Sequence, residues 1–361
     1  MGLGSLQQQL QTTGDFLALS REHPWSLPET FSFDVTHQAT TSQCTVSVFD
    51  TGIISFSPKG VDTTQDIVLS SGVHGNETAP IEICRDIIQK IILGQLNVGQ
   101  RVLFIFGNIA SMNIAERFVE ENMNRLFSGG HSLDQGNGAG LINKERERAL
   151  LLENTIKQFF EHGATLNKSR ERMHYDLHTA IRGAKYDKFA VYPYLHGKPR
   201  KSSQLQFLLA CGVNTVLLSN SPTTTFSYFS SKHFGADAFT IELGKVQPFG
   251  NNDMTQFKQV ASTLTKLVSG QNLELKAYDE NDFHIFTVAQ VINRQHEAFE
   301  LTFSSDTVNF TDFPKDHVLA IDGGNKIKTK HEGEAIIFPN ANVAIGQRAM
   351  LTVIPASLNE N

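Results

Sequence analysis

The segment from residue 66 to residue 83, DIVLSSGVHGNETAPIEI, constrains the fold more than any other part of the chain. An apolar run ends at a His-Gly-Asn-Glu turn, and a second apolar stretch led by Pro80 follows at once. This order predicts a buried strand, a tight turn and then a helix. His74 and Glu77 would then lie at the carboxyl edge of the strand, where open α/β sheets form their binding crevices.

Strand and helix patterns alternate from about residue 45 to residue 270. This alternation predicts an α/β fold, with helices on both faces of a mixed, largely parallel sheet. From about residue 276, short apolar segments separated by turn residues predict a smaller all-β domain. We therefore expect two domains, residues 1–272 and residues 273–361. The elements expected before the boundary include helices over 5–21, 80–93, 111–119, 144–162, 202–211 and 253–269, and strands over 66–72, 101–108, 173–180, 189–195, 214–220 and 238–243.

The His74–Glu77 turn offers two of the ligands that a divalent metal ion needs. A catalytic zinc ion usually takes three protein ligands and keeps one position for water. The best third ligand is His178 in YDLHTA, because it also ends a predicted strand facing the same crevice. A lone His-x-x-Glu is common by chance and differs from the helical HExxH of other metalloproteases. The prediction of a metal site therefore depends on the shared strand-end position of all three residues.

Two further segments carry charged side chains suited to hydrolysis of an anionic substrate. Glu242 in AFTIELG follows an apolar run and precedes a glycine, so it should also lie at a strand end, where a carboxylate can act as a general base. Asn124 and Arg125 in EENMNRLF can bind a substrate carboxylate, and Arg117 lies seven residues upstream of Asn124. The competing interpretation is that Glu242 and the arginines are ordinary surface charges.

Composition excludes several classes of protein. A net charge of −6 disfavours a general nucleic-acid-binding protein, which needs a basic face. The N-terminus lacks the features of a signal peptide, and no apolar window reaches the roughly 18 residues of a membrane span. The three cysteines, Cys44, Cys84 and Cys211, have no ligand-like spacing and suggest no disulfide framework. We expect a cytoplasmic protein that binds neither nucleic acid nor membranes.

The motifs SGVHGNETAP, NRLF, DLHTAIR and TIELG together resemble the zinc carboxypeptidase superfamily. The likeness is strongest to the branch that contains succinylglutamate desuccinylase and aspartoacylase, and HGNETAP with DLHTAIR favours the desuccinylase. It covers roughly residues 65–250, with a looser likeness in the β-rich tail. The resemblance implies a zinc-carboxypeptidase-like α/β sheet and a C-terminal β domain that narrows the mouth of the active site.

The resemblance also implies a role for each site residue. One Zn²⁺ ion per chain would be held by His74, Glu77 and His178. Glu242 would be the general base and acid, and the substrate's carboxylate would be bound by Asn124 and Arg125, with support from Arg117. The implied substrate is a small anionic N-acyl amino acid, N-succinyl-L-glutamate. Its hydrolysis to succinate and glutamate is the last step of arginine catabolism by the succinyltransferase pathway.

Two alternatives to this reaction stay open. The chain could be an aspartoacylase-like hydrolase of another N-acyl amino acid, or a non-catalytic anion-binding protein on the same fold. Glu242 favours an enzyme, because binding alone needs no proton shuttle.

One position departs from the family pattern. The family usually has an Asp two residues before the motif's Asn, whereas this chain has Asn122. An Asn carbonyl can still accept a hydrogen bond from a zinc-binding imidazole, but it lacks the negative charge that raises the basicity of the imidazole. Alternatively, Glu121 could take its place through a small shift in register.

The acyl group cannot be read from the residues alone. A succinyl group requires a second cationic subsite, and the candidates are Arg182, Lys185 and Lys245. The oligomeric state also stays open.

Overall fold

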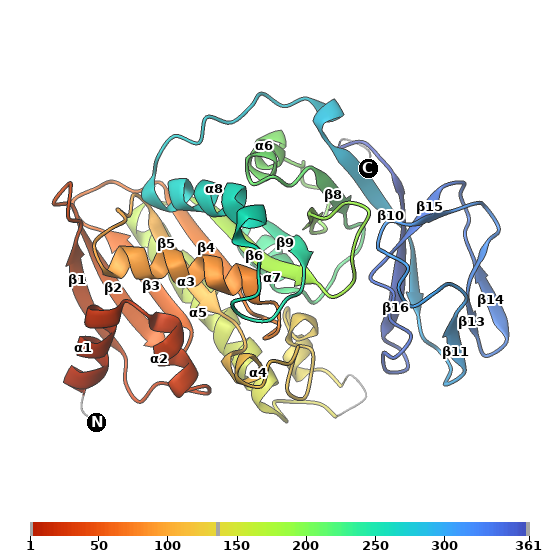
Figure 1. The fold of residues 1–361 in the computed structure, drawn as a ribbon, viewed down its shortest axis with the longest axis horizontal. Helices are drawn as coiled ribbons and strands as arrows, with labels where there is room; N and C mark the ends of the chain where they lie inside the picture. Colours follow the sequence, from red (N-terminus) through yellow and green to blue (C-terminus); the bar gives the residue numbers. More distant parts are fainter. Residues whose placement is uncertain (1–2, 135–137, 359–361) are drawn as a thin grey trace.

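The computed structural model describes residues 3–134 and 138–358, in which thirteen strands form one large sheet (Figure 1). In spatial order these strands are β1 (Phe31–Thr36), β2 (Gln43–Asp50), β3 (Ile53–Pro58), β5 (Arg101–Phe106), β4 (Gln65–Ser71), β6 (Glu171–Ala180), β9 (Asp237–Lys245), β7 (Phe189–Tyr192), β8 (Thr215–Leu218), β10 (His284–Asn293), β16 (Arg348–Pro355), β15 (Glu334–Ile337) and β12 (Asp312–Phe313). Strands β5, β4, β6 and β9 run parallel to one another in the centre, and antiparallel pairs flank them. The predicted mixed α/β sheet is confirmed.

Helices cover both faces of the central strands, as predicted. Successive side chains of a strand point to opposite faces, so Ile67 and Leu69 of β4 join one apolar core, while Val68 joins another. The first core includes side chains of α2 (Phe16–Glu22), α3 (Thr78–Ile92), α6 (Ser202–Ala210) and α8 (Lys258–Ser269); the second includes side chains of α5 (Lys144–Leu166) and α7 (Phe226–Phe234).

Three expectations about helices were wrong or incomplete. Residues 5–21 form not one helix but two, α1 (Leu3–Thr13) and α2, and Gly14 between them has a φ of +68°. The helix expected over 111–119 is the shorter α4 (Ile109–Asn113). Further along, backbone N–H groups of residues 119–121 donate to the Glu145 carboxylate rather than to helical carbonyls. Helix α7 was not predicted at all.

The C-terminal part is β-rich, as expected, and it continues the large sheet. Strand β10 pairs in parallel with β8 and antiparallel with β16. A second sheet of β11 (Phe299–Leu301), β13 (Val318–Asp322) and β14 (Asn325–Lys328) packs against it around a separate apolar core. The domain boundary at residue 272 stays a prediction. Within the described part of the chain, no helix is both long and apolar enough to cross a membrane.

Candidate active site

The His74–Glu77 turn connects β4 to α3 and is held tightly against α4. A Cβ atom at Gly75 would lie 2.3 Å from the backbone nitrogen of Met112, so only glycine fits there. Glu77 occupies the N-cap position of α3, yet its side chain makes no capping hydrogen bond. The Glu77 carboxylate is therefore available to groups on the neighbouring strand.

Strand β6 brings His178 to the same point, because it lies beside β4 in the sheet. Oε1 of Glu77 lies 2.9 Å from Nδ1 of His74, and Oε2 lies 2.8 Å from Nδ1 of His178. All three side chains are buried, and one potential ligand atom from each lies within 4.8 Å of the others. The structure thus brings together the three residues that the sequence singled out as metal ligands.

Several observations fit a metal ion among these residues. Among the described residues, Nδ1 of His74 is buried without a well-aligned hydrogen bond even though Oε1 of Glu77 lies 2.9 Å away, which is unusual for a polar atom in a folded protein. Burial and the charge of Arg117 lower the pKa of His74 to about 4, so its imidazole is neutral, as a ligand must be. Burial opposes a charge on His178, yet the carboxylates of Asp176 and Glu77 hold its pKa well above the usual value. An environment that favours positive charge at that position also favours a divalent cation, and the N, N, O donor set suits zinc.

Each imidazole is oriented through its second nitrogen. Nε2 of His178 lies 2.9 Å from Oδ2 of Asp176, and Nε2 of His74 lies 2.9 Å from Oδ1 of Asn122. The sequence reasoning missed Asp176, although the signal was there: residues two apart on a strand share a face, so Asp176 had to lie on the side of His178.

The alternative that Glu121 replaces the missing Asp is wrong. Its carboxylate binds the Arg146 guanidinium with two hydrogen bonds, of 2.7 and 2.8 Å, and accepts another from Asn143. Asn122 itself holds His74, and the same Oδ1 accepts a hydrogen bond from the backbone N–H of Asn124 at 3.1 Å.

Glu242 lies opposite His178 in the pairing of β9 with β6. The side chain is buried, and its Oε2 makes no hydrogen bond within the described structure. Burial and the negative charge of Glu77 raise the pKa of Glu242 to about 7. A carboxylate with such a pKa can both take up and release a proton near neutral pH.

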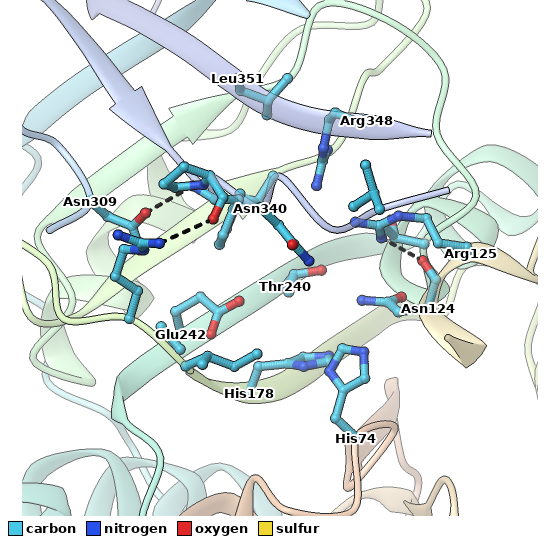
Figure 2. Close-up of a pocket in the computed structure, with 18 of the residues that line it drawn as sticks. His74, Asn124, Arg125, His178, Thr240, Glu242, Asn309, Asn340, Arg348 and Leu351 are labelled. Atoms are coloured by element: carbon cyan, nitrogen blue, oxygen red, sulfur yellow. Dashed lines mark hydrogen bonds between the residues drawn. The ribbon is translucent and has the colours of Figure 1, made fainter. Parts of the chain in front are cut away.

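The anion-binding candidates lie on the other side of the two histidines (Figure 2). The side-chain oxygen of Asn124 accepts a hydrogen bond from the backbone N–H of Phe226 at 3.0 Å, which fixes its orientation. The Arg125 guanidinium donates to the backbone carbonyl of Asn124 at 2.8 Å, and burial lowers the pKa of Arg125 well below its usual value. Arg117 donates a short hydrogen bond to Glu77, and its supporting role in substrate binding stays a prediction.

The three proposed metal ligands, Glu242 and the anion-binding candidates line one cavity of about 680 Å³, whose far wall comes from the C-terminal strands. Of the candidates for an acyl subsite, only Arg182 lines it, and its guanidinium donates to the carbonyls of Thr307 and Pro339. Lys185 pairs with Asp312 at the surface, and Lys245 is exposed. The sequence reasoning missed Arg348, which lines the cavity from β16; the one signal was a charged residue opening an apolar strand.

Two family models match the chain. The succinylglutamate desuccinylase/aspartoacylase catalytic domain matches residues 63–268, and the AstE/AspA barrel-sandwich hybrid domain matches residues 281–356. The chain is 52% identical over 357 residues to a succinylglutamate desuccinylase of Pseudoalteromonas atlantica, with 98% of each protein covered. It is 49% identical over 344 residues to one of Shewanella pealeana, with 95% of this chain and 96% of the relative covered.

Solved structures agree with these sequence relatives. A succinylglutamate desuccinylase from Vibrio cholerae superposes with a TM-score of 0.80 at 34% identity, covering 94% of each chain. One from Chromobacterium violaceum gives a TM-score of 0.79 at 33% identity, covering 96% of this chain and 99% of its own. These matches confirm the resemblance inferred from the motifs: the chain belongs to the succinylglutamate desuccinylase/aspartoacylase family.

Proposed function

We propose that the protein is a zinc-dependent amidohydrolase that converts N-succinyl-L-glutamate and water to succinate and L-glutamate. The observation that carries the proposal is the position of Glu242, a buried carboxylate with a free oxygen, beside a cluster of two histidines and a glutamate. The names of the full-length relatives supply the substrate. The reaction would be the last step of arginine catabolism by the succinyltransferase pathway, in the cytoplasm, which suits three buried free thiols.

His74, Glu77 and His178 would hold the zinc ion. Bound zinc would polarise the amide carbonyl and make water a better nucleophile. Asp176 and Asn122 accept the Nε2–H of the two imidazoles, which leaves the lone pair of each Nδ1 for the metal. Arg117, bonded to Glu77, would keep that carboxylate ionised and in place.

Glu242 would move the proton. Its carboxylate takes a proton from the attacking water as the new C–O bond forms at the succinyl carbon. It then gives the proton to the glutamate nitrogen as the C–N bond breaks, so the products are a carboxylic acid and an amine, which become a carboxylate and an ammonium group when the acid passes on its proton. A pKa of about 7 suits both steps, because the same group must be a base first and an acid afterwards.

Arg125 and Asn124 would fix one carboxylate of the substrate. A guanidinium binds a carboxylate with paired hydrogen bonds, and burial strengthens that attraction because little water competes. With this carboxylate held, the amide of the substrate lies between Glu242 and the histidines. Positioning of this kind lowers the activation barrier, because less orientational freedom is lost during the reaction.

The test compares hydrolysis of N-succinylglutamate, N-acetylglutamate and N-acetylaspartate, with and without a chelator, on protein whose zinc content is measured. We expect about one zinc per chain, preference for N-succinylglutamate and loss of activity with the chelator. Preference for N-acetylaspartate would contradict the proposed substrate, while the proposed reaction, zinc-dependent hydrolysis of an amide, would still stand. Zinc without hydrolysis of any of the three would indicate a binding protein instead.

A further inference from the structure

Arg348 is the first residue of β16, yet its side chain points into the cavity of the candidate active site (Figure 2). Within the described residues its guanidinium makes no hydrogen bond or ion pair, and its one defined contact is the Phe338 ring, 5.7 Å from ring centre to Cζ. Burial lowers the pKa of Arg348 to about 10. The side chain is half-buried, and within the described residues only an aromatic ring contacts its charged end.

The fully buried arginines of this chain, unlike the half-buried Arg348, all have oxygen partners. Arg101 and Arg170 share the carboxylate of Asp66, and Arg146 binds Glu121. Arg148 donates to three backbone carbonyls, those of Thr51, Phe106 and Gly107. A structural role normally leaves a buried charge satisfied in this way. Arg348 lacks such partners, so fold stability does not account for its position.

The charges around Arg348 indicate what it could bind. Arg125 lies close enough that the positive charge of Arg348 contributes, after burial, to the lowered pKa of Arg125. The acidic residues lining the cavity are Glu77, in the histidine cluster; Glu242, beside it; and Glu300, which is exposed. Two neighbouring guanidiniums that line one cavity repel each other until anions neutralise them. The pair suits a ligand with two carboxylates separated by a few carbon atoms.

We propose that Arg348 binds the side-chain carboxylate of the amino-acid half of the substrate, while Asn124 and Arg125 hold its α-carboxylate. This rests on the proposed function and adds that the C-terminal strands select a dicarboxylic amino acid. The succinyl carboxylate is a poorer match, because it lies beyond the scissile amide from the α-carboxylate. The two carboxylates of glutamate are separated by three carbon atoms, which suits the adjacent pair of cations.

The test uses two variants. Arg348→Met keeps much of the shape of the side chain and removes the charge, and Arg348→Lys keeps the charge but lacks the paired N–H donors of a guanidinium. Lys185→Met is the matched control, because it removes a surface cation outside the cavity. Four substrates combine a succinyl or acetyl group with glutamate or glutamine. We expect Arg348→Met to raise KM for both glutamate substrates roughly tenfold or more and to leave both glutamine substrates nearly unchanged. For Arg348→Lys, KM for the glutamate substrates should lie between the values of the parent protein and of Arg348→Met. The control variant should have the KM values of the parent protein.

Other outcomes overturn the proposal. If activity fell more on the succinyl substrates than on the acetyl substrates, Arg348 would be assigned to the succinyl half. If activity fell equally on all four substrates, its role would be structural. If Arg348→Met does not fold, Arg348→Lys and Arg348→Gln are tested in its place, again by comparing the loss on the glutamate substrates with the loss on the glutamine substrates. If the parent protein hydrolyses none of the four, the proposed function fails, and calorimetry with L-glutamate and L-glutamine decides instead. If the parent protein binds L-glutamate more tightly than L-glutamine and the Arg348 variants lose this difference, the subsite is still supported. If the parent protein binds both amino acids equally, or neither of them, the proposal is overturned.

Discussion

The two imidazoles of the candidate metal site are supported very differently. His178 and its partner Asp176 both belong to β6, in the centre of the sheet, and Asp176 also accepts a hydrogen bond of 2.5 Å from Ser70. His74 lies on a turn, and its partner Asn122 caps a short 3-10 helix, Met123–Arg125. A carboxylate both orients an imidazole and makes it more basic, whereas an amide only orients it. The strand-borne half of the site is thus reinforced by charge, and the loop-borne half depends on geometry alone.

The residues proposed to act on the substrate are divided between the same two halves of the site. Glu242, the proposed base, stands in register with His178 on the strand-borne half. Asn124 and Arg125, the proposed carboxylate ligands, lie two and three residues after Asn122 on the loop-borne half. Two hydrogen bonds therefore link the support of His74 to the placement of the substrate: the backbone N–H of Asn124 donates to Oδ1 of Asn122, and the backbone N–H of Arg125 donates to the Asn122 carbonyl. The comparison suggests that chemistry depends on the strands and recognition on the loop.

The largest effect should come from Glu242→Gln. The amide keeps the size of the side chain and cannot take up the water proton, so kcat should fall roughly a thousandfold. Zinc content should stay at the level of the parent protein, because Glu242 is not one of the proposed ligands. Steady-state kinetics and metal analysis on one preparation provide the test, and an active Gln variant would refute the role of Glu242.

Arg125→Ala should have the next largest effect, and a different signature. Removing the guanidinium should reduce kcat/KM for N-succinylglutamate about a hundredfold, since a paired, charged hydrogen bond is lost. An uncharged N-acyl amide should be hydrolysed almost as before, however poorly. If both substrates lost activity equally, Arg125 would be structural and the loop would have no special part in recognition.

Asp176→Asn tests the strand-borne half directly. It turns the partner of His178 into the same amide that supports His74, so zinc affinity should fall about 10- to 100-fold. Competition with a chromophoric chelator measures this without any turnover. Unchanged affinity would show that the carboxylate on β6 contributes only orientation, and the two halves of the site would then be equivalent.

Asn122→Asp makes the reciprocal change and should have the smallest effect. Aspartate can keep both the cap of Asn124 and the hydrogen bond to His74, and it adds the missing negative charge. We expect zinc to bind about three- to tenfold more tightly by the same competition measurement. A decrease in affinity would mean that the loop-borne half was already optimal with an uncharged partner.

Much of the fold was predictable because local patterns agree with it. The apolar run of β4, the turn at His74 and the helix led by Pro80 all appear where the sequence places them. Helix α7 was missed because FSYFSSKHF has no clear apolar period, and its first backbone N–H is held by distant Asn124. Helix α4 is shorter than expected because Ala115 has a φ of +56°, which interrupts the helix, and distant Glu145 takes the N–H groups of residues 119–121.

Some residues of the site could likewise be predicted from the sequence, and others could not. Residues at strand ends, such as His178 and Glu242, could be placed from sequence because parallel strands end at one edge of a sheet. Asp176 could have been placed by the two-residue period of a strand. Arg348 could not, because its place depends on how the C-terminal strands join the rest of the chain. No local pattern encodes that contact.

The pairing of β8 with β10, which extends the sheet into the C-terminal strands, has a mechanical consequence. Four residue pairs, from His284↔Thr215 to Thr287↔Leu218, lie in register along this seam. A hinge there would have to break backbone hydrogen bonds, so we expect the wall that carries Arg348 to stay in place during each catalytic cycle. We therefore expect this wall of the mouth to move little as substrate enters and products leave, and amide protons along the seam to exchange with solvent as slowly as those of the central strands.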